Sequence, residues 1–213
     1  MRECTQCPCC TGVGGYSGIF ASTSVESNTV EAYDPVTNTW TTLAALPGGR
    51  GRLGVGVIEG ILYAVGGSHV LPASDHFYLD SVEAFDPSAN TWTTRKPMLT
   101  ARDGLAVGVV NGILYAVGGY NNQYRYIPTV EAYDPSTNTW STRAPLPTSR
   151  AELAAGVVNG PLYAVGGVWV SLPAVIFQQR VDAYTPRLPS AESVRHPYPY
   201  RTRGPWGKGL AKR

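Results

Sequence analysis

Short apolar runs alternate with turn signals along most of the chain, and the pattern is clearest in its middle third. Residues 105–110 and 113–117 are two apolar runs divided by Asn111-Gly112, a dipeptide that favours a two-residue hairpin turn. A third run covers 129–134 and ends at an Asp-Pro turn, and a fourth covers 140–143. The pattern predicts four short antiparallel strands in this stretch.

The same unit recurs along the chain with a period of about 50 residues. The recurring landmarks are a Gly-Gly doublet after the second run, an acidic residue in the third run and a tryptophan in the fourth. The doublets stand at 66–67, 118–119 and 166–167, the acidic residues at 31, 83, 131 and 182, and the tryptophans at 40, 92 and 140. Doublets and tryptophans both step by 52 and then by 48 residues, so the copies are repeats. Strand repeats of this period are typical of propellers and predict an all-β protein.

Each tryptophan is preceded, seven positions earlier, by an aromatic residue in phrases such as Val-Glu-Ala-Tyr-Asp-Pro at 130–135. These aromatic residues are Tyr33, Phe85 and Tyr133. Together with the glycine doublets they make residues 14–186 resemble kelch repeats. The resemblance implies a kelch-type β-propeller. It implies no activity by itself, because propellers include both binding modules and enzymes.

The repeats predict four blades between residues 14 and 186. The expected blades are 14–46, 50–95, 102–143 and 150–186, of which the middle two are complete and the outer two partial. Two interpretations are open: an imperfect four-bladed ring, or part of a larger propeller. Closed propellers have about four to eight blades. We favour the incomplete propeller, because Ala191 stands where the repeat would place a tryptophan after Tyr184.

The segments outside the repeats differ from them in composition. Residues 1–13 contain a cramped group of four cysteines, Cys4, Cys7, Cys9 and Cys10. We expect a disordered start there, with metal binding as the alternative, because zinc modules present separated cysteine pairs. Residues 187–213 hold seven Lys/Arg and one Glu without the period, which predicts a disordered basic tail. Contact of this tail with an acidic partner or a membrane is the alternative.

Residues 1–186 include ten basic and fourteen acidic residues, and this acidic excess argues against nucleic acid as a partner. No apolar run of about eighteen residues is present, so no membrane span is predicted. No apolar stretch of the secretory type follows Met1, which leaves the compartment open with the cytoplasm as the default. The glycines end strands instead of beginning helices, so we expect no nucleotide cofactor.

Strand parity places the variable loops on one face of the blades. The connections at 68–80, 120–128 and 168–175 are long and differ between copies, and the loops between blades emerge on the same face. Long variable loops on a rigid scaffold commonly carry recognition. The candidate binding residues there are Arg50, Arg52, Arg102, Arg150, His69, Tyr78, Asn121, Asn122, Tyr124 and Arg125. We expect a protein or peptide partner with acidic residues, because guanidinium groups bind carboxylates in a planar, bidentate way.

Three of these arginines, Arg50, Arg102 and Arg150, each lie sixteen residues before a glycine doublet. Two interpretations are open for them. They form an arc around the channel mouth that binds the partner, or they pair with the repeated acidic residues of the blades.

The phrase Arg-Gly-Arg-Leu-Gly-Val-Gly-Val at 50–57 is similar to kelch domains of BTB–kelch ubiquitin-ligase substrate adaptors. In the oxidative-stress member of that group, an arginine just before such a strand contacts acidic peptides, and Arg52 matches its position. Gly104 and Glu152 stand at the corresponding places of the next two blades. The resemblance therefore implies only part of that arginine pocket.

Two packing features are expected from the repeat. The first strand of each blade should lie near the axis, where the small residues at 54, 56, 106, 108 and 154–156 suit the limited space. Trp40, Trp92 and Trp140 should wedge between neighbouring blades. In an incomplete propeller Trp40 should be less buried than the others, because the blade beside it is missing.

The predicted function is a non-catalytic protein-interaction scaffold. The alternative is a kelch-propeller enzyme, such as a sugar epimerase or a sugar oxidoreductase. An enzyme would need converging titratable groups on the long-loop face. His69 and His76, with Asp75 between them, are the candidates for such groups.

Overall fold

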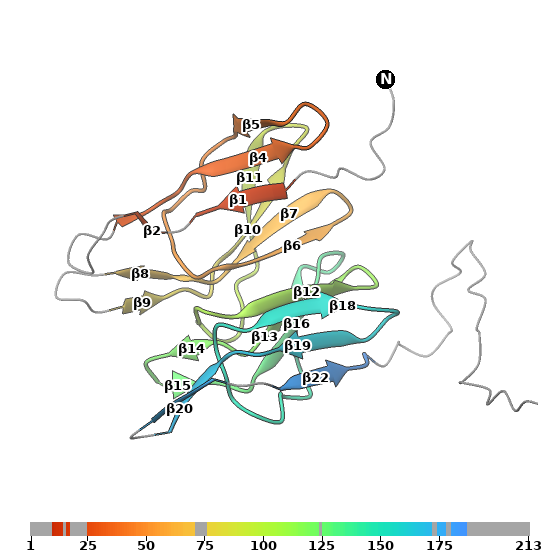
Figure 1. Cartoon of the computed structure of the whole chain (residues 1–213). Coiled ribbons are helices and arrows are strands. Elements are labelled where there is room, and N and C mark those ends of the chain that lie inside the picture. The colour runs from red at the N-terminus through yellow and green to blue at the C-terminus, as the bar shows by residue number, and fades with distance from the viewer. Residues whose placement is uncertain are drawn as a thin grey trace, which may run out of the picture.

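The computed structural model describes residues 10–14, 16–17, 25–70, 76–123, 125–171, 174–177 and 180–186 (Figure 1). All regular structure in these residues is β. None of them belongs to a helix long and apolar enough to cross a membrane.

Four antiparallel sheets follow one another along the chain, one for each predicted blade, and we number them blades 1 to 4. Blade 1 contains β1 (Cys10–Val13), β4 (Val30–Asp34) and β5 (Thr39–Thr42). Blade 2 contains β6 (Gly54–Ile58), β7 (Ile61–Val65), β10 (Val82–Asp86) and β11 (Thr91–Arg95). Blade 3 contains β12 (Ala106–Val110), β13 (Ile113–Val117), β16 (Val130–Asp134) and β17 (Thr139–Arg143). Blade 4 contains β18 (Ala154–Val157), β19 (Leu162–Val165) and β22 (Val181–Tyr184).

The turns inside the blades form as their residues predict. Asn111 and Gly112 have φ angles of 51° and 76°, the left-handed conformation that a two-residue turn between twisted strands requires. At the end of β16 the Asp134 carboxylate accepts the backbone N–H of Ser136 at 2.9 Å, which closes the Asp-Pro turn. Hydrogen bonds from Ser136 are the first cause that lowers the pKa of Asp134 below its ordinary value.

Blade 1 begins earlier than the sequence suggests. Residues 10–13 form β1, which pairs in antiparallel register with β4 from Cys10↔Tyr33 to Val13↔Val30. Val13 packs against the buried pair Val30 and Leu46. This corrects the expectation of disorder up to residue 13, because the strand before Gly14 is present and completes a three-stranded sheet. Residues 1–9 and 187–213 lie outside the described residues, and their predicted disorder stays a prediction.

The long loops are themselves two-stranded hairpins, which the sequence pattern did not reveal. The pairs are β2 (Tyr16–Ser17) with β3 (Val25–Glu26), β8 (Ser68–Val70) with β9 (His76–Tyr78), β14 (Tyr120–Asn121) with β15 (Arg125–Tyr126), and β20 (Val168–Ser171) with β21 (Ala174–Phe177). All four hairpins extend from the same side of the molecule (Figure 1). We call this side the hairpin face.

The glycine doublets join each second strand to its hairpin by a close backbone approach. Gly118 and Gly119 have φ angles of 63° and 114°. A Cβ atom on Gly118 would lie 2.6 Å from the carbonyl oxygen of Arg150, which belongs to the loop before blade 4. Only glycine combines this conformation with this approach. The doublet therefore marks the place where the loop between two blades rests on the preceding blade.

The first strands β6, β12 and β18 lie next to one another, as a propeller requires. The blades are so close here that side chains of one blade occupy the space beside the first-strand glycines of the blade before it. A Cβ atom on Gly108 would lie 2.3 Å from Cδ1 of Leu162 in blade 4. Gly156, the equivalent residue of blade 4, would present its Cβ to open space. The expected place for small residues is confirmed.

This pair of glycines allows a matched test of blade packing. We expect Gly108→Ala to lower the free energy of unfolding by about 1–3 kcal/mol, because Leu162 is buried and has little room to move. Gly156→Ala should cost nothing measurable in urea denaturation, since its new methyl group meets no atom within 4 Å. Equal losses for the two variants would contradict the packing described for β12.

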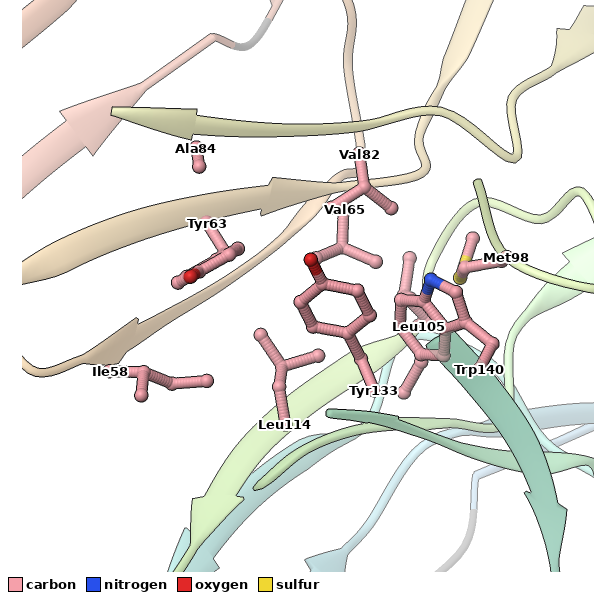
Figure 2. Packing of buried hydrophobic residues seen from close by; sticks show 11 residues of the cluster. Ile58, Tyr63, Val65, Val82, Ala84, Met98, Leu105, Leu114, Tyr133 and Trp140 are labelled. Atoms are coloured by element: carbon pink, nitrogen blue, oxygen red, sulfur yellow. The ribbon is translucent and has the colours of Figure 1, made fainter. Parts of the chain in front are cut away.

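Trp92 and Trp140 wedge between blades as predicted, whereas Trp40, in the first blade, is exposed. In the cluster between blades 2 and 3, Trp140 lies beside Tyr133, Leu105 and Met98 (Figure 2). Its Nε1 donates a hydrogen bond to the carbonyl oxygen of Lys96 in blade 2 at 2.8 Å. Trp92 makes the equivalent bond to the Ala44 carbonyl in blade 1 at 2.9 Å. Each indole thus joins its own blade to the blade before it.

The described blades form an open arc with blade 1 and blade 4 at opposite ends (Figure 1). Apolar side chains are exposed at both ends. In blade 1, Trp40 is 60% exposed, whereas Trp140 is only 9% exposed. In blade 4, Val157, Val165 and Val181 are exposed. The described residues form an incomplete β-propeller with two complete and two partial blades, and the prediction for Trp40 is confirmed.

Candidate functional site

The three equivalent arginines of the loops between blades are buried. Arg50 is 4% exposed, and Arg102 and Arg150 are 0% exposed. Each guanidinium forms an ion pair with the acidic residue of the following blade. The pairs are Arg50 with Glu83, Arg102 with Glu131, and Arg150 with Asp182.

Arg102 shows what this arrangement does. Besides Glu131, its Nη1 donates to the carbonyl oxygens of Gly118 and Thr129 at 3.1 and 3.0 Å. The side chain therefore fastens both ends of the β14–β15 connection to blade 3. Burial lowers the pKa of Arg102, and the charge of Glu131 acts in the opposite direction. An arginine stays charged even so, which makes the pair a buried salt bridge.

The two interpretations of these arginines are thereby decided by geometry. Arg50, Arg102 and Arg150 do not form a binding arc on the surface, because their charged groups are shielded from water and each is paired with a carboxylate of the following blade. This corrects their assignment as candidate binding residues. Burial alone would raise the pKa of Asp182, but hydrogen bonds from Arg180 and Arg150 lower it overall. Glu31, the equivalent acid of blade 1, is exposed.

The residues that do meet around the axis each stand two positions after one of these arginines. The backbone N–H of Gly104 donates to the carbonyl oxygen of Arg52 at 2.9 Å, and that of Glu152 donates to Gly104 at 2.7 Å. All three residues have left-handed φ angles of 52–57°. Equivalent residues of blades 2, 3 and 4 are thus joined in a continuous arc. We call Arg52, Gly104 and Glu152 the axial arc.

The axial arc carries mixed charge. Arg52 is half-exposed, with Nη1 3.7 Å from Asp103 Oδ2 and Nε 3.4 Å from Glu152 Oε1. Asp103 is buried and accepts a hydrogen bond from the Ser68 hydroxyl at 2.8 Å. Burial raises the pKa of Asp103, while Ser68 and Arg52 favour its charged form. The predicted cluster of four arginines is therefore one accessible arginine held between two carboxylates.

Short bridges hold the hairpins against this arc. Gly51 pairs with Ser68, Asp103 with Tyr120, and Ala151 with Val168. These contacts place the loops between blades and the hairpins on the same face, as strand parity predicts. The candidate residues of the hairpins and Arg52 therefore share one surface.

An aromatic row crosses from the hairpin of blade 2 to that of blade 3. Tyr78 lies 6.0 Å from His76 and 5.8 Å from Tyr120, measured between ring centroids, and Tyr120 lies 5.1 Å from Tyr126. Arg125 Nη1 donates to the Tyr120 hydroxyl at 3.3 Å. Sequence reasoning found Tyr78 and Arg125 but missed Tyr120 and Tyr126. The concentration of aromatic residues in the variable loops was the available signal.

The remaining candidate residues differ in their exposure to solvent. His69, in β8, is half-buried, and Asn122 is exposed in the turn of the β14–β15 hairpin. Asn121 is buried, and its Nδ2 donates to the Ala101 carbonyl at 2.9 Å, so it has a structural contact. Tyr124 lies outside the described residues. The candidate site thus retains Arg52, His69, Tyr78, Asn122 and Arg125.

Metal ligands do not gather in the part of the chain that the structure describes. No group of three or more His, Cys, Asp or Glu side chains there is arranged to hold a metal ion. Cys4, Cys7 and Cys9 lie outside the described residues, and of Cys10 only the backbone is described. The proposal of metal binding by these cysteines stays untested.

Comparison with known proteins gives three findings. A family described as Kelch motif matches residues 13–47, 49–99 and 101–147. Human Kelch-like protein 28 is 39% identical over 114 residues, covering 52% of this chain and 19% of that protein. Zebrafish (Danio rerio) Kelch-like ECH-associated protein 1A is 44% identical over 92 residues, covering 43% of this chain and 15% of that protein.

The fold has a solved counterpart in a structure described as YjhT. The TM-score is 0.60 at 19% identity, and the match covers 81% of this chain and 65% of the other. This likeness shows the fold alone. The chain spans less than a fifth of the length of the two kelch-like relatives, so their whole-protein activities are not shown for it.

Proposed function

Because the chain belongs to the kelch repeat family, we propose that it is a non-catalytic scaffold that binds a protein partner on its hairpin face. The similarity to kelch-like proteins suggests an interaction scaffold in general terms.

The observation that carries the proposal is the aromatic row beside the axial arc. Tyr78, Tyr120 and Tyr126 are half-buried, and the hairpins that bear them are bridged to the loops between blades. Tyrosines of this kind supply contact area with few rotatable bonds, and aromatic and arginine residues are enriched in protein interfaces. A rigid, mixed aromatic and polar surface suits recognition of a polypeptide.

The charges of this face favour a partner segment that combines an acidic residue with apolar ones. Arg52 and Glu152 are both about half-exposed, and such a surface pair contributes little by itself. A partner carboxylate can therefore replace Glu152 as the second ligand of the guanidinium. Arg125 is also exposed and offers a second charged donor.

The alternative, a sugar epimerase or oxidoreductase, requires titratable groups that are free to exchange protons. The groups that converge at the axial arc, Arg52, Asp103 and Glu152, are instead tied to each other in ion pairs. This arrangement supports binding over catalysis.

The proposed face can be tested by charge reversal. We expect Arg52→Glu to weaken capture of the cognate partner at least fivefold, because it places a third carboxylate beside Asp103 and Glu152. Position 52 tolerates glutamate in its backbone conformation, since Glu152 has the same φ angle in blade 4. Arg125→Glu should act in the same direction. The measurement is binding of a partner identified by affinity capture, followed by titration with each variant.

The matched control is Glu59→Lys in the β6–β7 turn on the opposite face. Its partner affinity should equal that of the parent chain. If Glu59→Lys abolishes binding while Arg52→Glu and Arg125→Glu leave it intact, the partner binds the other face and the proposal is wrong.

A further inference from the structure

The contact between blades 2 and 3 is repeated between blades 3 and 4, except for its tryptophan. Tyr63, Ala84, Tyr133 and Trp140 belong to the first contact, in which Tyr133 lies beside both Tyr63 and Trp140. Tyr115, Ala132 and Tyr184 hold the equivalent positions in the second. The Tyr63–Tyr133 rings lie 5.8 Å apart and the Tyr115–Tyr184 rings 5.7 Å apart, so the two walls have the same spacing. No tryptophan belongs to the second cluster.

A groove of about 680 Å³ occupies this place. Its walls come from β13, β16, β17 and the end of β22, and they include Tyr115, Ala132, Arg143, Ala144 and Tyr184. Among the described residues, no strand pairs with the outer edge of β22, whereas β10 and β16 each have an outer neighbour there. The groove and the open edge lie side by side, which is the arrangement that an outer strand would need.

The contacts that contain a tryptophan show which groups an outer strand uses to bind the preceding blade. In blade 3, Trp140 Nε1 donates to the Lys96 carbonyl, and the Asn138 side-chain oxygen accepts the Lys96 N–H at 3.0 Å. In blade 2, Trp92 and Asn90 bind the carbonyl and N–H of Ala44 in the same way. In both strands, an Asn-X-Trp motif therefore binds the N–H and the carbonyl of a single residue in the preceding blade. In blade 3 the residue equivalent to Ala44 and Lys96 is Ala144, which lines the groove.

We propose that the groove beside β22 is a binding site for an extended segment of another polypeptide that carries Asn-X-Trp. The segment would add to the edge of β22 as a fourth strand, place its indole beside Tyr184 as Trp140 lies beside Tyr133, and bind the backbone of Ala144. Strand addition of this kind combines main-chain hydrogen bonds with a side-chain pocket. It goes beyond the hairpin-face function, since it uses a different surface.

The chain's own next residues do not supply this motif at the repeat spacing. Asparagine and tryptophan stand five and seven positions after the aromatic residue in blades 1 to 3, as at Tyr133, Asn138 and Trp140. The same positions after Tyr184 are Pro189 and Ala191. Proline has no N–H for a strand ladder, and alanine cannot fill an indole pocket. A segment from another chain therefore fits the site better than the chain's own continuation.

The test uses the full chain and a fluorescently labelled peptide that copies residues 137–143, Thr-Asn-Thr-Trp-Ser-Thr-Arg. We expect saturable binding by fluorescence anisotropy. Replacement of the peptide's tryptophan by alanine should weaken binding at least tenfold, and replacement of its asparagine about threefold or more. These losses follow from the desolvated pocket and the lost hydrogen bond.

Two variants of the chain locate the peptide. Ala144→Pro removes the N–H that the asparagine would accept, and it should weaken binding by a factor similar to that of the asparagine replacement. Arg52→Glu lies on the hairpin face and should leave the peptide affinity unchanged. Circular dichroism checks that both variants remain folded.

Several outcomes would overturn the proposal. One is the absence of saturable binding, which would mean that the groove is closed or filled by the chain itself. Another is equal binding of the peptide that lacks tryptophan, and a third is loss of binding in Arg52→Glu with none in Ala144→Pro. If the peptide instead dissociates a self-associated form of the chain in size-exclusion chromatography, the occupant is a second copy, and the proposal of a different polypeptide is wrong.

Discussion

Arg102→Ala is expected to lower the free energy of unfolding by about 3–5 kcal/mol, the cost of leaving one partner of a buried salt bridge unpaired. Arg102 is fully buried and holds Glu131 together with the carbonyl oxygens of Gly118 and Thr129. Its loss leaves a buried carboxylate without a counter-charge and two carbonyl groups without this donor. The measurement is urea denaturation followed by circular dichroism.

Two controls separate the buried charge from the loss of side-chain volume. The double variant Arg102→Met with Glu131→Leu removes both charges and should be less destabilised than the single variant, because no unpaired charge remains. Arg125→Ala removes an exposed arginine and should change the stability by less than about 1 kcal/mol. A cost below about 1 kcal/mol for Arg102→Ala would show that the pair has no structural role.

Trp140→Ala should cost about 3–5 kcal/mol, as is usual when a large aromatic side chain is removed from a core. The indole fills the contact between blades 2 and 3 and binds the Lys96 carbonyl (Figure 2). Trp40→Ala provides the matched comparison at the equivalent position of blade 1. Trp40 is 60% exposed and touches mainly Tyr33 of its own blade, at 5.2 Å between ring centroids.

We expect the Trp40 variant to lose less than about 1 kcal/mol, because a surface substitution away from packed contacts has a small effect. Thermal or urea unfolding of both variants gives the comparison. If Trp40→Ala proves as costly as Trp140→Ala, the exposure of blade 1 does not describe the chain in solution. That result would indicate that another polypeptide or another copy covers this end of the arc.

The strands and their turns could be predicted because their signals are local. The Asn111-Gly112 turn needs left-handed backbone angles at two adjacent residues, and its own side chains favour them. The tryptophan contacts were also predictable, since the repeat places a large ring at the same point of successive outer strands, where it meets the preceding blade. A turn or a contact that every blade needs places the same residue type at the same spacing in the sequence.

The hairpins of the long loops left no such trace. β14 and β15 are only two residues each, and the loops differ in length and composition between blades. Their pairing depends on the bridge between Asp103 and Tyr120, which joins a hairpin to the loop between two blades. A contact between such separate segments follows from the arrangement of the blades and not from a local pattern. The aromatic row on these hairpins was therefore missed in part.

The arginines show the division most clearly. The sequence by itself determined that Arg50, Arg102 and Arg150 are equivalent and that each blade offers an acidic partner. Only the tertiary structure decided that these groups are buried pairs, while Arg52, two positions after Arg50, remains at the surface. Exposure to water decides whether an arginine is paired inside the fold or available to a partner. That depends on how closely the next blade packs, which spacing along the chain does not specify.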